Sequence, residues 1–129
     1  VKHITAVDTI YQECDYITVH VPLTDETKDM ISAPQFKQMK STAVLINAAR
    51  GGIVNEHDLY EALKNKEIYA SAADVYTSAP PMASGEPWVE ELLKLDNFVL
   101  TSHIGSRSQE SEINTVEVAT DNMIKLLTE

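Results

Sequence analysis

Short apolar runs alternate with amphipathic, helix-like segments along most of the chain. Branched, aromatic or small residues make five of these runs typical of strands, at residues 4–7, 16–21, 43–49, 69–75 and 98–101. The segments between them repeat apolar residues every three or four positions, which is the period of a helix with one buried face. Strands that alternate with helices favour the α/β class, with one parallel sheet and flanking helices.

Helix start signals support this division. Asp8 has the position of an N-cap, and Ser32 and Gln35 have the spacing of a capping box. Asn55 begins the next helix, and Ser106 is the natural cap of the long last helix. The apolar faces of these last two helices comprise Leu59, Ala62 and Leu63, and then Ile113, Val116, Ala119, Met123 and Leu126.

Composition narrows the class of protein. The 129 residues suffice for about one domain with a real core. A net charge of −10 and scattered basic residues argue against a surface for nucleic acid or anionic lipid. No apolar stretch approaches the roughly 18 residues that cross a bilayer, and no signal peptide is expected. The single cysteine, Cys14, suits a reducing compartment. We therefore predict a cytoplasmic protein without nucleic-acid or membrane partners.

Arg50 is the first candidate for chemistry. It follows the apolar run 44–46 and precedes Gly51 and Gly52. Arginine is always charged, and its planar fork fits a carboxylate with two parallel hydrogen bonds. Taken alone, this segment is equally consistent with an ordinary surface arginine at a strand exit.

Other chemistry-bearing residues also follow predicted strands. They are His20, Arg50, Asp74 and His103. The carboxyl ends of parallel strands share one edge of a sheet, so these side chains are expected to converge on one crevice. Each has a simpler interpretation. His20 is best explained as a partly buried packing residue, Asp74 could bind nearby backbone groups, and His103 could cap the last helix. Packing alone does not readily explain why an arginine, an aspartate and a histidine should all converge on one edge of the sheet.

The remaining polar candidates carry less weight. His3 and His57 have no special context and are interpreted as surface residues. No metal site is predicted. The long irregular stretch 77–88 holds three of the five prolines, and loops of this length are often functional. The alternative is a surface excursion pinned by Trp88.

Four segments, 14–24, 45–54, 73–76 and 100–105, resemble the NAD-dependent D-isomer-specific 2-hydroxyacid dehydrogenases. This family includes D-lactate, D-glycerate, D-3-phosphoglycerate and formate dehydrogenases. The motifs occur in the family's order and near its spacings. The resemblance implies a Rossmann-type domain and hydride transfer between NAD(H) and a D-2-hydroxyacid or 2-oxoacid.

The resemblance implies a role for each matching residue. Arg50 would hold the substrate carboxylate and polarise the C2 carbonyl. His103 would be the general acid in reduction and the base in oxidation, which suits a side chain that titrates near neutral pH. Asp74 would orient the nicotinamide carboxamide. The other implied cofactor contacts are Val21 and Pro22 beside the adenosine, Thr27 near the phosphates, Ala48 and Ala49 along the nicotinamide riboside, and Gly105 and Ser106 beside His103.

The sequence departs from the family at two positions near the histidine. Ala79 stands where the family has a glutamate that pairs with the histidine, so slower catalysis and an altered pH profile are expected. Glu86 offers a second register for that glutamate, although the spacing favours Ala79. The change could be natural or engineered. Ser102 replaces the usual proline and is expected only to loosen the approach to His103.

The family's glycine-rich first βα unit and its separate substrate-binding domain have no counterpart here, and no G-x-G-x-x-G occurs. We therefore interpret residues 1–129 as the second half of an NAD-binding domain, which should not turn over by itself. A homodimer is expected for the intact protein. The choice of hydroxyacid and of NAD or NADP stays open. The main alternative is a non-catalytic NAD(H)-binding regulator, comparable to the family's corepressors. A generic α/β module is the weakest interpretation.

Overall fold

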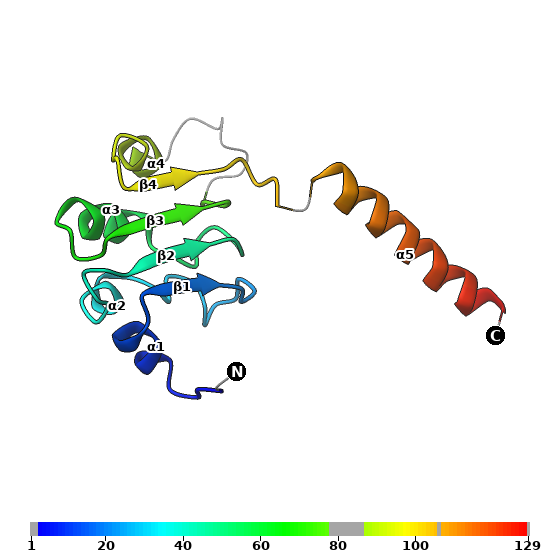
Figure 1. Ribbon diagram of the computed structural model, residues 1–129, viewed down its shortest axis with the longest axis horizontal. Coiled ribbons are helices and arrows are strands. Elements are labelled where there is room, and N and C mark those ends of the chain that lie inside the picture. Colours follow the sequence, from blue (N-terminus) through cyan, green and yellow to red (C-terminus); the bar gives the residue numbers. More distant parts are fainter. Residues whose placement is uncertain (1–2, 78–86, 106, 129) are drawn as a thin grey trace.

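The computed structural model describes residues 3–77, 87–105 and 107–128, and its centre is a four-stranded parallel sheet (Figure 1). The strands follow one another in chain order, β1-β2-β3-β4. They comprise β1 (Tyr16–Val19), β2 (Val44–Asn47), β3 (Ala70–Ala73) and β4 (Phe98–Leu100). The helices comprise α1 (Val7–Glu13), α2 (Ala33–Phe36), α3 (Glu56–Lys64), α4 (Pro87–Leu92) and α5 (Gln109–Thr128). The α/β class predicted from the alternation is confirmed.

The two faces of the sheet differ in burial. In β1 and β2 alternate side chains are buried, with Ile17 6% and Leu45 0% exposed, whereas Tyr16 is 76% exposed. Parallel strands in sequential order with right-handed crossovers place their connecting helices on the same face. The core lies between this face and the helices, and its fully buried side chains include Phe36, Ile31, Ile53, Leu63 and Ile68.

Capping interactions fix the helices α2 and α3 as predicted. The Gln35 side chain accepts the backbone N–H of Ser32 at 3.1 Å, and Asn55 Oδ1 accepts the backbone N–H of Asp58 at 3.0 Å. Asp58 also serves the neighbouring helix, because its Oδ2 accepts the backbone N–H of Ala33 at 2.8 Å. One carboxylate thus joins the first turn of α3 to the start of α2.

Several predictions about elements were wrong. Residues 4–7 do not form a strand, because β1 pairs only with β2 and nothing else in the described chain offers these residues a ladder. The sheet therefore has four strands rather than five. Helix α1 has Ala6 as its N-cap, and Asp8 lies inside the first turn. Strand β2 ends at Asn47 rather than at 49, because the Asn47 side chain captures the backbone N–H of Ala49.

Helix α5 extends away from the sheet (Figure 1). None of its described residues is buried. Its predicted apolar positions are exposed, Val116 by 66% and Met123 by 62%. Ser108 caps this helix by accepting the backbone N–H of Ser111 at 3.2 Å, and the predicted cap Ser106 lies outside the described residues. No helix among the described residues is long and apolar enough to cross a membrane.

Candidate active site

Three candidate residues follow neighbouring strands at one edge of the sheet. Arg50 comes after β2, Asp74 after β3 and His103 after β4, and the parallel pairing puts all three strand ends on the same side. Neighbouring strands lie about 4.8 Å apart, so the turns that carry Arg50 and His103 begin roughly 10 Å apart, with Asp74 between them. This separation allows two long side chains to reach one small molecule.

The turn that carries Arg50 is held from inside. Asn47 donates from Nδ2 to the Arg50 carbonyl at 3.0 Å and accepts the Ala49 N–H at 3.1 Å. Ala49 therefore points inward and is 9% exposed, while Arg50 is exposed. Arg50 donates from Nη1 to the Ala49 carbonyl at 2.7 Å. Within the described residues no carboxylate forms an ion pair with this guanidinium.

The two glycines after Arg50 answer different constraints. A Cβ on Gly51 would lie 1.9 Å from the carbonyl oxygen of Tyr76, so only glycine lets the chain pass the residues that follow β3. A Cβ on Gly52 would meet only Leu23, in ordinary van der Waals contact at 3.7 Å, but Gly52 has a φ of 81°, in the region that favours glycine. The Arg50 turn is thus tied closely to the end of β3.

Asp74 organises the turn that carries His103. Its Oδ1 accepts the Thr101 hydroxyl at 2.5 Å and the Ile104 N–H at 3.1 Å, and its Oδ2 accepts the Gly105 N–H at 3.0 Å. The sequence left two roles open for Asp74: binding nearby backbone groups and orienting the nicotinamide carboxamide. The structure shows the first of these. The Thr101 hydroxyl, followed by the two backbone donors and His103, lowers the pKa of the Asp74 carboxyl below its usual value against the opposing effect of burial.

His103 lies in a backbone conformation that side chains seldom adopt. Its φ is 57°, in the left-handed region, and its side chain is exposed. Histidine enters this region more readily than branched residues, but the conformation still costs free energy unless the surroundings fix it. The two N–H groups after His103 are bound to Asp74, which supplies that restraint.

Five of the predicted cofactor residues, Val21, Pro22, Ala48, Ala49 and Arg50, line an open hollow beside the ends of β1 and β2. The hollow has a free volume of about 680 Å³, and it is lined by His20, Val21, Pro22, Leu23, Ala48, Ala49 and Arg50. The lining combines apolar side chains with a guanidinium, which suits a flat ring joined to anionic groups. The residues present therefore fit part of a dinucleotide.

Some predicted contacts are placed differently from expectation. His20 is exposed rather than partly buried, and its Nε2 lies 2.8 Å from the Thr18 hydroxyl, so the packing interpretation was wrong. The Thr27 hydroxyl donates to the Pro22 carbonyl at 2.6 Å and thereby closes its own loop. Its contact with the cofactor phosphates stays a prediction. Ser106 and Ala79 lie outside the described residues.

Sequence reasoning missed two residues that shape this edge. Asn47 was counted as part of an apolar run, although a polar side chain at a buried strand position is a signal in itself. Glu56 was not singled out, yet its Oε1 accepts both the N–H and the hydroxyl of Thr77, at 2.6 and 2.8 Å. His57 is exposed as predicted, and its ring also packs edge-on against that of Trp88, with ring centres 4.3 Å apart.

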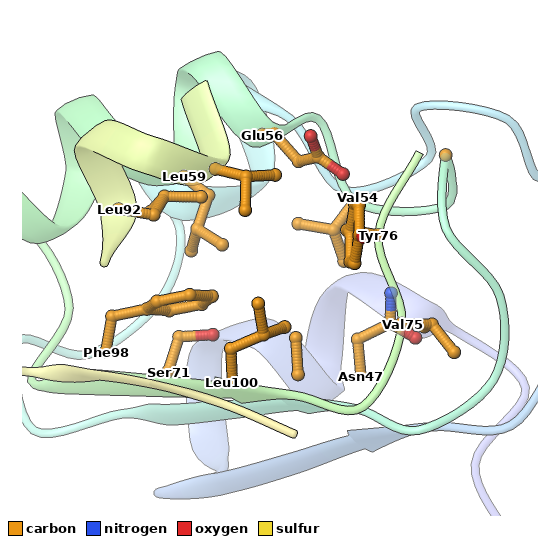
Figure 2. Close-up of a pocket in the computed structure, with 13 residues that line it drawn as sticks. Asn47, Val54, Glu56, Leu59, Ser71, Val75, Tyr76, Leu92, Phe98 and Leu100 are labelled. Atoms are coloured by element: carbon orange, nitrogen blue, oxygen red, sulfur yellow. The ribbon is translucent and has the colours of Figure 1, made fainter. Parts of the chain in front are cut away.

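A second cavity lies inside the domain, between the sheet and the helices α3 and α4 (Figure 2). Its free space is about 20 Å³, enough for one water molecule and far too small for a substrate. The Tyr76 hydroxyl is buried there without a hydrogen-bond partner among the described residues. Burial, and secondarily Glu56, raise the pKa of Tyr76. The open edge, and not this cavity, is the candidate site.

Known proteins share this architecture. Residues 1–105 match the family model described as "D-isomer specific 2-hydroxyacid dehydrogenase, NAD binding domain". The chain is 42% identical over 119 residues to the D-3-phosphoglycerate dehydrogenase of Archaeoglobus fulgidus, covering 92% of this chain and 22% of that one. It is 43% identical over 120 residues to the glyoxylate/hydroxypyruvate reductase B of Salmonella newport, covering 93% and 36%.

Solved structures agree. The D-isomer specific 2-hydroxyacid dehydrogenase from Lactobacillus delbrueckii ssp. bulgaricus, in its NAD complexed form, superimposes with a TM-score of 0.86 at 30% identity, covering 96% of this chain and 40% of that one. The D-lactate dehydrogenase with NAD+ from Lactobacillus jensenii gives 0.83 at 32% identity, covering 95% and 39%. The chain thus spans well under half the length of these relatives. It belongs to the NAD-binding domain family of the D-isomer specific 2-hydroxyacid dehydrogenases.

Proposed function

We propose that this chain carries the nicotinamide side of the active site of an NAD-dependent D-2-hydroxyacid dehydrogenase. The observation that carries the proposal is the order of three turns along one sheet edge, with Arg50, Asp74 and His103 following neighbouring strands. Family membership indicates that the cofactor is NAD, and the hollow beside Arg50 fits part of that dinucleotide.

Arg50 binds the carboxylate of the substrate. Its guanidinium has five N–H donors, and one bond to the Ala49 carbonyl leaves enough for a two-point contact. Charge-assisted bonds of this kind fix both the position and the orientation of a carboxylate. A substrate held in this way turns its C2 atom toward the centre of the edge, between Arg50 and His103.

His103 exchanges the proton. In reduction, hydride adds to C2 of the 2-oxoacid and His103 gives a proton to the carbonyl oxygen, which becomes the hydroxyl group. In oxidation His103 takes the hydroxyl proton as hydride leaves C2. NAD, when bound, supplies the hydride acceptor, and NADH supplies the donor. The exposed position of His103 on a restrained turn suits this exchange.

Asp74 has two roles: it forms hydrogen bonds that hold the turn carrying His103, and it contacts the cofactor. A carboxylate offers about four acceptor positions, and three are taken by Thr101, Ile104 and Gly105. One acceptor position on Oδ2 remains for the amide of the nicotinamide. The same carboxylate thus aligns the cofactor ring and the turn that carries His103.

The relatives indicate a substrate class rather than one compound. Their names specify D-3-phosphoglycerate, glyoxylate or hydroxypyruvate, and D-lactate. Each of these has an oxygen next to a carboxylate, which is the pattern that Arg50 and His103 would bind together. For this chain we propose a small 2-oxoacid or D-2-hydroxyacid.

A chimera tests the proposal directly. The 129 residues replace the matching segment of the Archaeoglobus fulgidus D-3-phosphoglycerate dehydrogenase, and NADH oxidation is followed with glyoxylate, pyruvate and hydroxypyruvate. We expect turnover with at least one of them, and a loss of more than about 100-fold with His103→Asn. Lys94→Met is the control, because within the described part of the chain Lys94 pairs only with Glu91, on the surface, at 2.5 Å. A folded chimera that binds NADH without turnover would contradict catalysis.

That last outcome would favour the second candidate, a non-catalytic NAD(H)-binding regulator. Ala79, in place of the family's glutamate, is the sequence feature on its side. Arg50 and His103 oppose it, because a regulator needs neither a carboxylate clamp nor a proton carrier. Homodimerisation and a cytoplasmic location stay predictions, testable by sedimentation and by cell fractionation.

A further inference from the structure

The last residue of β2, Asn47, is buried at the base of the Arg50 turn. Its side chain is 6% exposed on the helix-covered face of the sheet and lines the inner cavity (Figure 2). We propose that Asn47 is a positioning residue, which fixes Arg50 in the orientation that binds the substrate carboxylate. This inference rests on the proposed function, in which Arg50 binds the substrate carboxylate.

The amide of Asn47 is used at both ends within three residues. Its oxygen accepts the Ala49 N–H at 3.1 Å, and its nitrogen donates to the Arg50 carbonyl at 3.0 Å. These bonds end the strand, turn the Ala49 side chain into the core and leave Arg50 outside. Since the contacts are with backbone atoms only, they fix the direction of the turn and do not occupy the guanidinium.

Asn47 is also connected to the turn that carries His103. Its own carbonyl accepts the Asp74 N–H at 2.9 Å, and the Asp74 carboxylate binds the N–H groups of Ile104 and Gly105. A continuous set of hydrogen bonds therefore runs from the Arg50 turn through the ends of β2 and β3 to the His103 turn. Within this set of hydrogen bonds, Asn47 fixes the position of the Arg50 backbone relative to the turn that carries His103.

Ser71 provides the matched control. It is the other buried polar residue that the described chain places on the covered face, 4% exposed, and its hydroxyl donates to the Leu45 carbonyl at 2.9 Å. Ser71→Ala therefore removes one buried hydrogen bond from the same sheet without touching either turn. A general loss of stability would affect both variants, whereas a positioning role affects Asn47 alone.

The test uses the 129-residue chain, labelled with ¹⁵N, and three variants. In Asn47→Ala we expect exchange of the Ala49 amide to accelerate roughly 10-fold relative to strand amides. We also expect the order parameter of the Arg50 amide to fall from about 0.85 to below about 0.6. Ser71→Ala should change neither. Asn47→Ser keeps an oxygen that can accept the Ala49 N–H but is too short to reach the Arg50 carbonyl. It should protect Ala49 and still loosen Arg50, which keeps the test valid if the alanine variant fails to fold.

The two proposals fail in different ways. Unchanged order at Arg50 in both Asn47 variants overturns the positioning role, whatever the chain binds. Oxamate, a 2-oxoacid analogue, is then titrated with NADH into the chimera and into its Asn47 and Ser71 variants, while the Arg50 Nε–H signal is followed. Loosening in the variants with no response to oxamate would support the positioning of the turn and count against the proposed function. A response that is lost in Asn47→Ser and kept in Ser71→Ala supports both.

Discussion

Asp74 and Gly105 lie in direct contact, with the Gly105 N–H donating to Asp74 Oδ2 at 3.0 Å. A Cβ on Gly105 would lie 3.1 Å from the same oxygen, so the glycine keeps this approach open. The contact joins the end of β3 to the turn after β4, across which His103 adopts its left-handed conformation. The geometry of the turn that carries His103 therefore depends on a charge that acid can remove.

The stability of this turn should depend on pH below about 5. The pKa of Asp74 is lowered in the folded chain, first by the Thr101 hydroxyl and then by the backbone donors. A lowered pKa contributes stability that is complete above the unfolded value and is lost as the pH falls through the folded value. The free energy of unfolding should therefore exceed that of Asp74→Asn by about 1–2 kcal/mol at pH 7. This difference should shrink toward pH 3, as urea titrations can measure.

Asp15 is the control for that experiment. Its pKa is also lowered, mainly by Thr42 and then by Lys40, but it lies at the opposite edge of the sheet. Asp15→Asn should leave amide exchange at Ile104 and Gly105 unchanged, whereas Asp74→Asn should accelerate both. Equal exchange at these amides in the two variants would show that Asp74 does not hold the turn.

Gly51 and Gly52 should respond differently to alanine. The added Cβ of Gly51→Ala meets the Tyr76 carbonyl oxygen at 1.9 Å, a backbone clash that must move one of the two segments. We expect a loss of about 2–4 kcal/mol in the free energy of unfolding. The added Cβ of Gly52→Ala meets only Leu23, at 3.7 Å. Its cost comes mainly from the φ of 81°, and we expect a loss of about 1 kcal/mol in the free energy of unfolding. Urea unfolding of both variants checks this order, and a reversed order would contradict the structure here.

The parallel sheet and the shared edge of Arg50, Asp74 and His103 could be predicted from the sequence, because both follow from the alternation of strands and helices along the whole chain. Alternating strands and helices predict a parallel sheet, and a parallel sheet puts Arg50, Asp74 and His103 on one edge. What failed depended on partners that no local pattern specifies. Residues 4–7 read as a strand but have no strand beside them in the described chain, and Asn47 ends β2 by a side-chain bond inside an apolar run. His20 alternates like a packing residue, yet it lies on the sheet face that α3 and α4 do not cover.

Glu56 should hold the segment that leaves β3. Its Oε1 receives both donors of Thr77, at 2.6 and 2.8 Å, from the first turn of α3. Glu56→Ala removes a charged acceptor for two bonds, so the Thr77 amide should exchange about 10-fold faster. Glu56→Gln keeps a neutral acceptor and should have a smaller effect. Asp58→Asn changes the other carboxylate in the first turn of α3, which binds the Ala33 N–H at the start of α2, and it should leave exchange of the Thr77 amide unchanged. Faster exchange of Thr77 in Asp58→Asn would indicate a general opening of α3 instead.

Arg50→Lys separates the charge of the side chain from its shape. The Asn47 contacts are with backbone atoms, so the turn should keep its structure and the Ala49 amide should keep its protection. Lysine retains the positive charge but cannot form the two parallel bonds of a guanidinium. In the chimera we expect the KM for the 2-oxoacid to rise roughly 10- to 100-fold, while the KM for NADH changes by less than about 3-fold. Lys94→Met should alter neither constant. An equal rise in both KM values would place Arg50 in general cofactor binding, and an unchanged KM for the oxoacid would remove it from carboxylate recognition.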